Sequence, residues 1–236
     1  MKKLVTAFAA CALAGLAFAQ VESVNIVGYQ TLSLPTGYKM ATSTFVPVGS
    51  DGTSLRLGDI VPTNFDGANG DTVQFFNLNG SGSVSTTAWY FAGYGWFDFN
   101  TNESLDDMLI PAGTGMYVNS TLAGAEFLVA GEVLQEASTL VLPTGYTVAG
   151  NSSPVEITLG QIVPNASFDG ANGDTVQFFD PTGSGIVTTT AWFFAGYGWF
   201  DFNTNESLDA MVINPGDAFY VNATQANAQL SFPAVL

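Results

Sequence analysis

The sequence predicts an all-β protein made of two tandem, internally duplicated antiparallel domains, each a β-sandwich or a half-open barrel. The main observation is that AWYFAGYGWFDFNTNESLD at residues 88–106 returns as AWFFAGYGWFDFNTNESLD at 191–209, with Phe193 in place of Tyr90 as the only difference. Short runs of Val, Ile, Thr and aromatic residues also alternate with turns rich in Gly, Pro, Asn and Asp, which is typical of antiparallel strands. No window shows a sustained helical period.

The duplication extends through most of the chain. Three further pairs of segments match: TLSLPTGY at 31–38 with TLVLPTGY at 139–146, FDGANGDTVQFF at 65–76 with the same residues at 168–179, and IPAGTGMYVN at 110–119 with INPGDAFYVN at 213–222. The offset falls from 108 to 103 residues between the first and second pairs, so the first copy has a longer loop around residues 47–53. We therefore place one β domain at residues 20–134 and the second at 135–236.

The chain begins with the pattern of a secretory signal peptide. Lys2 and Lys3 precede an apolar run that ends in Ala-Phe-Ala, so we expect residues 1–19 to be removed before Gln20. The style of the signal is bacterial, and it predicts a secreted or cell-surface protein, with the periplasm as the alternative location. The single cysteine, Cys11, would be lost with the signal, so no disulfide framework is available.

Composition excludes several classes of function. All twenty acidic residues lie beyond residue 19, where Lys39 and Arg56 are the only cations, which gives a formal charge of −18. Nucleic acid and anionic lipid headgroups are therefore poor partners, because binding them depends on Lys and Arg. The hydrophobic fraction of 47% is high enough for a folded core. No apolar run after the signal reaches the roughly 18 residues of a membrane span.

The same composition predicts that the protein is not an enzyme. Histidine is absent from the chain, which removes the usual general base near neutral pH and every nucleophile that depends on it. A hydrolase would have to rely on a carboxylate pair such as Asp98 with Glu103 or Asp106. Nothing else in the sequence supports such a pair.

The duplicated DFNTNESLD segment is a candidate calcium loop, because its oxygen-bearing residues have the alternating spacing of such loops. The predicted ligands are Asp98, Asn100, Asn102 and Asp106, and in the second copy Asp201, Asn203, Asn205 and Asp209. The glycine and the bidentate glutamate of a calcium loop are missing, since Glu103 and Leu109 occupy their positions. The competing interpretation is that Asp and Asn form an Asx turn here.

The aromatic residues of the duplicated block are candidates for binding sugar rings, because aromatic side chains offer large rigid contact area. The candidate residues are Trp89, Tyr94, Trp96, Trp192, Tyr197 and Trp199. Alternation along a strand places Trp96 on one face and Phe97 and Phe99 on the other. One set must face the core, and the pattern alone leaves open which set does so.

The turn and strand motifs resemble those of an uncharacterised family of secreted bacterial tandem β-repeat proteins. The motifs are VNIVGY, LPTGY, GWFD, IPAG and a closing GEV, and they cover most of the chain after the signal. The resemblance implies a β-repeat fold and export, and it carries no catalytic residue. The second copy departs from the pattern because it ends in FPAVL.

Together these features predict a non-catalytic structural or adhesive component of the cell exterior, such as a surface layer, filament or matrix. Its partners would be copies of itself or other cell-surface components. Residues 22–30 are expected to lie outside the duplicated unit and to add a strand to a neighbouring subunit. The alternative function is a carbohydrate-binding module, with calcium as a possible cofactor and glycans as partners.

Overall fold

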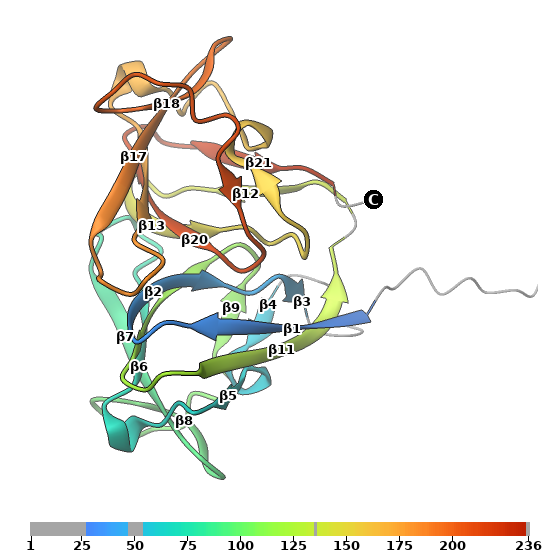
Figure 1. Ribbon diagram of the computed structural model, residues 1–236, viewed down its shortest axis with the longest axis vertical. Coiled ribbons are helices and arrows are strands. Elements are labelled where there is room, and N and C mark those ends of the chain that lie inside the picture. Colours follow the sequence, from blue (N-terminus) through green and yellow to red (C-terminus); the bar gives the residue numbers. More distant parts are fainter. Residues whose placement is uncertain (1–26, 47–53, 135, 235–236) are drawn as a thin grey trace, which may run out of the picture.

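The structure is a computed structural model that describes residues 27–46, 54–134 and 136–234. Every pairing between its named strands is antiparallel, which confirms the all-β prediction. The expected signal peptide and the longer loop of the first copy, residues 47–53, fall outside the described residues. Figure 1 shows the two copies one above the other along the longest axis.

The first copy, here called repeat 1, contains a five-stranded sheet and a second, smaller sheet. The five-stranded sheet has the order β2 (Gly37–Thr42), β10 (Gly115–Ser120), β6 (Thr72–Phe76), β7 (Val84–Phe91), β8 (Gly95–Asp98). The smaller sheet pairs β11 (Ala125–Val133) with β1 (Val27–Leu34), β3 (Phe45–Val46) and β5 (Val61–Thr63). A short ladder joins β4 (Ser54–Arg56) to β9 (Leu109–Pro111).

The second copy, repeat 2, has the same strand order in its five-stranded sheet, but its smaller sheet has no counterpart of β3 among the described residues. Its five-stranded sheet runs β13 (Gly145–Gly150), β20 (Ala218–Ala223), β16 (Thr175–Phe179), β17 (Val187–Phe194), β18 (Gly198–Asp201). The smaller sheet is β12 (Ser138–Val141), β21 (Gln229–Phe232), β15 (Val163–Pro164), and the short ladder joins β14 (Ile157–Thr158) to β19 (Val212–Ile213). Four 3-10 turns complete the two copies: Leu57–Asp59, Gly67–Asn69, Leu159–Gln161 and Gly170–Asn172.

Each repeat is a small sandwich with its own core. In repeat 1, Leu32 of β1 and Phe127 of β11 pack in one cluster with Val73 and Val118 of the five-stranded sheet. The corresponding cluster of repeat 2 draws only on residues between 140 and 232. Alternation explains the pattern, since each strand sends every second side chain to the face that meets the other sheet.

The expectation that residues 22–30 add a strand to a neighbouring subunit is wrong for residues 27–30. Residues 27–30 belong to β1 and pair with β11 of the same chain, with Val27 opposite Glu132. Gln30 is also part of the duplicated unit, because the 108-residue offset brings it onto Ser138 at the start of β12, whereas residues 27–29 precede that match. Residues 22–26 lie outside the described residues.

The repeats meet through equivalent segments related by an approximate two-fold axis. The backbone N–H of Tyr38 donates to Gly183 O over 2.8 Å, and the equivalent N–H of Tyr146 donates to Gly80 O over 2.8 Å. Two aromatic contacts are reciprocal in the same way: Phe76 with Tyr220 and Tyr117 with Phe179. Such reciprocity is the property of an isologous interface. As a result, β8 and β18 lie at opposite ends of the molecule (Figure 1).

Candidate functional surfaces on the duplicated hairpin

The duplicated block forms the hairpin β7–β8 in repeat 1 and β17–β18 in repeat 2. In β7–β8, Tyr90 lies opposite Trp96 and Trp89 lies opposite Phe97. The turn at the tip needs backbone with positive φ, which Gly93 (φ 81°) and Gly95 (φ 102°) supply. Tyr90 and Trp96 therefore line one face of this hairpin, and Trp89 and Phe97 line the opposite face.

Trp96 and Trp199 face the core and do not form a contact surface. Each side chain is 1% exposed, and each indole N–H donates to a buried carbonyl, Ile60 O at 3.1 Å and Ile162 O at 3.0 Å. The interpretation of these two residues as sugar-binding platforms is therefore wrong. Burial of a large ring together with a satisfied polar group makes them packing anchors of each sandwich.

The opposite face of the hairpin carries a half-exposed aromatic cluster. In repeat 1 it consists of Trp89, Phe91, Phe97 and Phe99, and in repeat 2 of Trp192, Phe194, Phe200 and Phe202. We call these the outer aromatic clusters. Phe99 and Phe202 are each 50% exposed. Trp89 and Trp192 are partly buried, and unlike Trp96 they lie on the face of the hairpin that carries these exposed rings.

The rings of an outer aromatic cluster are tilted against one another. Trp89 makes angles of 66° with Phe91 and 59° with Phe99, at centroid distances of 5.0 and 5.1 Å. The angles in repeat 2 are 68° and 59°. Edge-to-face packing of this kind is favourable for the rings themselves, but it does not present a shared flat plane to a sugar chain. The geometry is that of an apolar patch.

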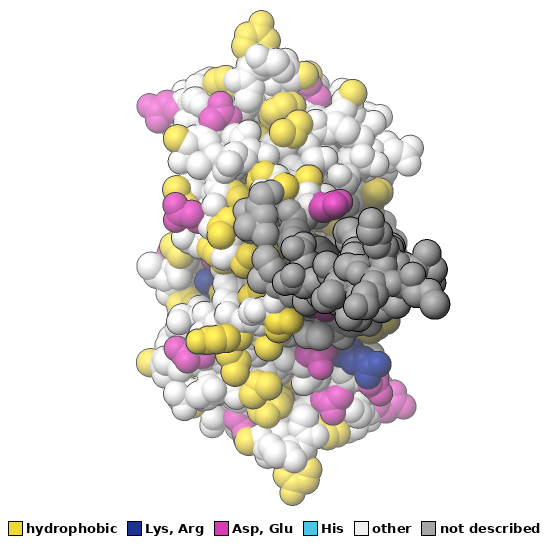
Figure 2. All heavy atoms as spheres, turned by 90° about the vertical axis from the view of Figure 1, so that its right-hand side faces the viewer, with side chains coloured by type: hydrophobic (Ala, Val, Ile, Leu, Met, Phe, Trp, Pro, Cys, Tyr) yellow, Lys and Arg dark blue, Asp and Glu magenta, His cyan; other side chains and the backbone are white. Residues whose placement is uncertain are grey.

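Tyr94 and Tyr197 occupy the hairpin tips. Both side chains are 79% exposed, and no ring contact involving either is found among the described residues. Figure 2 shows hydrophobic side chains at both extreme ends of the molecule. These two tyrosines are the sequence-predicted aromatic residues that solvent reaches most fully.

The segment predicted as a calcium loop contains an Asx turn. Asp98 Oδ1 accepts hydrogen bonds from the backbone N–H groups of Asn100 at 2.8 Å and Thr101 at 2.9 Å. These bonds, that of Thr101 foremost, hold the pKa of the Asp98 carboxyl below its usual value. Asn102 closes the turn with a left-handed backbone (φ 59°), a conformation that Asn tolerates well. Asp201, Asn203 and Asn205 repeat the same arrangement.

Asp106 and Asp209 have a different local role. Asp106 Oδ1 accepts the backbone N–H of Trp96 at 2.8 Å, and Asp209 does the same for Trp199. Each carboxylate therefore satisfies a backbone donor on the outer edge of β8 or β18. In the described part of the chain, no group of three or more carboxylate, cysteine or histidine side chains is placed to hold a metal ion.

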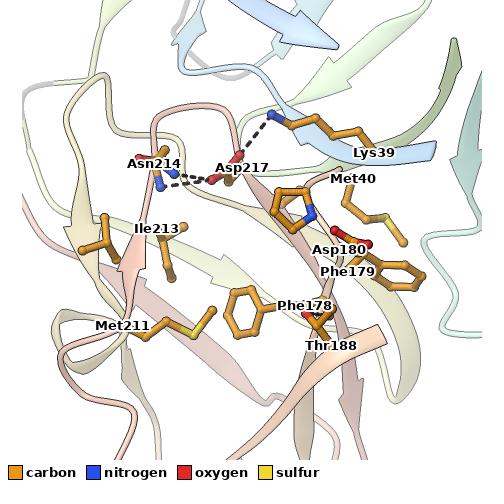
Figure 3. Close-up of a pocket in the computed structure, with 13 residues that line it drawn as sticks. Lys39, Met40, Phe178, Phe179, Asp180, Thr188, Met211, Ile213, Asn214 and Asp217 are labelled. Carbon is orange, nitrogen blue, oxygen red and sulfur yellow. Dashed lines mark hydrogen bonds and ion pairs between the residues drawn. The ribbon is translucent and has the colours of Figure 1, made fainter. Parts of the chain in front are cut away.

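A hollow of about 190 Å³ between the repeats was not foreseen from the sequence (Figure 3). Its apolar floor includes Met40, Phe178 and Met211. At its rim, Lys39 Nζ of repeat 1 lies 3.2 Å from Asp217 Oδ1 of repeat 2. The segments that form this hollow are separated by more than one hundred residues in the sequence. The only sequence signal near it is that the two copies differ at Lys39 and at Asp217.

Comparisons with known proteins add no family. No helix in the described ranges is long and apolar enough to cross a bilayer. No protein-family model, no curated protein and no solved structure matches the chain.

Proposed function

We propose that the chain is a secreted, non-catalytic structural or adhesive component of a bacterial cell exterior, such as a surface layer, a filament or a matrix. The observation that carries the proposal is the pair of outer aromatic clusters, which have the same residues and ring geometry and lie on hairpins at opposite ends of one molecule. A unit with two like contact surfaces that point apart can link two neighbours.

Charge supports this function. The two outer aromatic clusters are apolar, while the chain beyond residue 19 has twenty acidic residues against two cations. Repulsion between copies keeps such a chain dispersed at low ionic strength. Salt shortens the screening length to about 8 Å at 0.15 M, so apolar contacts between copies become favourable as salt rises.

The carbohydrate-binding alternative retains one supporting observation, the exposure of Tyr94 and Tyr197 at the hairpin tips. A single exposed ring at each tip could stack on a sugar. The tilted rings of the outer aromatic clusters do not support it.

Sedimentation velocity of residues 20–236 at increasing salt tests the proposal. We expect larger species to accumulate with salt, and the double variant Phe99→Ser, Phe202→Ser to remain a monomer at the same salt. Tyr29→Ser is the matched control, because Tyr29 is 78% exposed but lies on β1, away from both hairpins. A wild-type chain that stays monomeric throughout would refute self-association. Reproducible glycan-array binding lost in Tyr94→Ala, Tyr197→Ala would favour the alternative.

A further inference from the structure

The backbone contacts between the repeats do not by themselves determine which repeat pairs with which. Besides the bonds of Tyr38 and Tyr146, the N–H of Thr42 donates to Gly216 O at 2.9 Å and the equivalent N–H of Gly150 donates to Gly113 O at 3.0 Å. All four bonds use main-chain atoms that both repeats possess. Two copies of repeat 1, or two of repeat 2, could therefore form the same bonds. Side chains at the interface must decide between these pairings.

A steric conflict blocks the pairing of repeat 1 with repeat 1. Thr42 and Gly150 occupy equivalent positions and face each other, and a Cβ atom on Gly150 would lie 2.3 Å from Thr42 Cγ2. Pairing two copies of repeat 1 in this geometry places a threonine in the position of Gly150. Non-bonded carbon atoms need about 3.5 Å, so the backbones would have to move apart and lose their hydrogen bonds.

A different conflict blocks the pairing of repeat 2 with repeat 2. Gly115 lies against Val148, and a Cβ atom on Gly115 would lie 2.2 Å from Val148 Cγ1. The residue equivalent to Gly115 in repeat 2 is Ala218. Two copies of repeat 2 would therefore press the Ala218 methyl group into Val148. Each repeat carries the glycine that accommodates the other repeat's larger residue.

Charge favours the same pairing. Lys39 and Asp217 form an ion pair across the interface, with side chains only 18% and 33% exposed (Figure 3). The equivalent residues are Thr147 and Thr114. Like pairs would therefore leave two lysines, or two aspartates, at the interface without the opposite charge. Partly buried charges that lose their partner are unfavourable.

We propose that this interface is a heterospecific recognition surface: repeat 1 binds repeat 2, of its own chain or of a second copy, and rejects another repeat 1. Two complementary glycines and one ion pair provide the discrimination. This inference goes beyond the proposed function and does not depend on it. It predicts that the chain closes on itself, or exchanges repeats with a second copy, and never joins like repeats.

The test uses the folded full chain with a protease site inserted between Val133 and Ser138, the segment that connects the repeats. After cleavage and overnight dilution, native mass spectrometry counts the three possible pairs. Random pairing would make like pairs half of all complexes. We expect fewer than about one tenth, because a bias of 1.4 kcal/mol already corresponds to tenfold. Random proportions, or halves that separate entirely, would overturn the proposal.

Two sets of variants keep the test decisive. Thr42→Gly should raise the amount of repeat 1 pairs and Ala218→Gly that of repeat 2 pairs, while Tyr94→Ser at the hairpin tip should leave the distribution unchanged. In the uncut chain, Lys39→Asp should lower the unfolding midpoint, and adding Asp217→Lys should restore it. A charge exchange that restores nothing would show that the ion pair does not contribute to recognition, and would contradict the proposal even if the cut halves unfold.

Discussion

Replacing Trp96 by Phe distinguishes a packing anchor from a contact surface. The change removes the indole N–H that donates to Ile60 O at 3.1 Å and reduces a ring that is 1% exposed. A buried acceptor left without a donor costs about 1–3 kcal/mol, and the smaller ring leaves a cavity among Phe65, Tyr90 and Phe127. We expect a loss of about 2–4 kcal/mol in the free energy of unfolding.

Trp89→Phe is the matched change on the other face of the same hairpin. Trp89 Nε1 is buried and has no hydrogen-bond partner among the described residues, so removing this N–H gives up no bond. We expect a change below about 1 kcal/mol. Trp199→Phe should match Trp96→Phe within about 0.5 kcal/mol, because its indole bond to Ile162 O has nearly the same length.

Urea unfolding followed by far-UV circular dichroism measures all three variants without relying on tryptophan fluorescence. Because each repeat has its own core, the transition is fitted with two steps if the halves unfold separately. Equal losses for Trp96→Phe and Trp89→Phe, or a larger loss for Trp89→Phe, would refute the assignment of the two faces.

Three further predictions follow from buried or hydrogen-bonded ionisable groups. Asp71 is fully buried and accepts two backbone N–H groups, so Asp71→Asn should lower the free energy of unfolding by about 1–3 kcal/mol in urea titrations, because its amide can accept only one of them. Backbone hydrogen bonds hold the pKa values of Asp98 and Asp201 below the usual 3.8. The stability that these two carboxylates contribute is complete above pH 3.8 and is lost as the pH falls through the folded pKa. The double variant Asp98→Asn, Asp201→Asn should therefore lose less stability in acid than the wild-type chain does. Burial raises the pKa values of Tyr117 and Tyr220 above the usual 10.0. The stability that the two neutral phenols contribute is complete below pH 10.0 and is lost as the pH rises through the folded pKa. The double variant Tyr117→Phe, Tyr220→Phe should therefore lose less stability in alkali than the wild-type chain does.

The strand pattern and the duplication were sufficient to predict the fold class, because turns rich in Gly, Pro, Asn and Asp separate short β-rich runs and most of these turns occur in both copies. The face of the hairpin that meets the core could not be predicted. Both faces are aromatic, so hydrophobicity does not distinguish Trp96 from Trp89. The register of β7 against β6 identifies the outer face of the hairpin, because the polar residues Gln74 and Thr87 pair on that face, which Trp89 shares. That register depends on the loop at residues 77–83, whose path the sequence does not reveal.

The sequence predicts either an Asx turn or a calcium loop at Asp98, and the spacing of the residues alone does not distinguish them. Alternating oxygens suit both a calcium loop and a turn in which the carboxylate accepts backbone N–H groups. The interface between the repeats could not be predicted from the sequence, for a different reason. The sequence shows that the two copies differ at Thr42 and Gly150, and at Gly115 and Ala218. Only the fold shows that each glycine lies against a larger residue of the other repeat.

The two kinds of surface have diverged in opposite ways. The outer aromatic clusters have the same residues in both repeats, and the one difference in the duplicated block, Tyr90 to Phe193, lies on the inner face beside a buried tryptophan. The interface instead differs at complementary positions, such as Lys39 against Thr147 and Asp217 against Thr114. A surface that makes the same contact at both ends of a molecule can keep identical residues in both copies. A surface that joins two unlike partners becomes more specific when the residues of the two partners differ in a complementary way. This contrast links the two proposals: a heterospecific joint fixes one chain as one unit, and that unit then presents the same aromatic contact at each end.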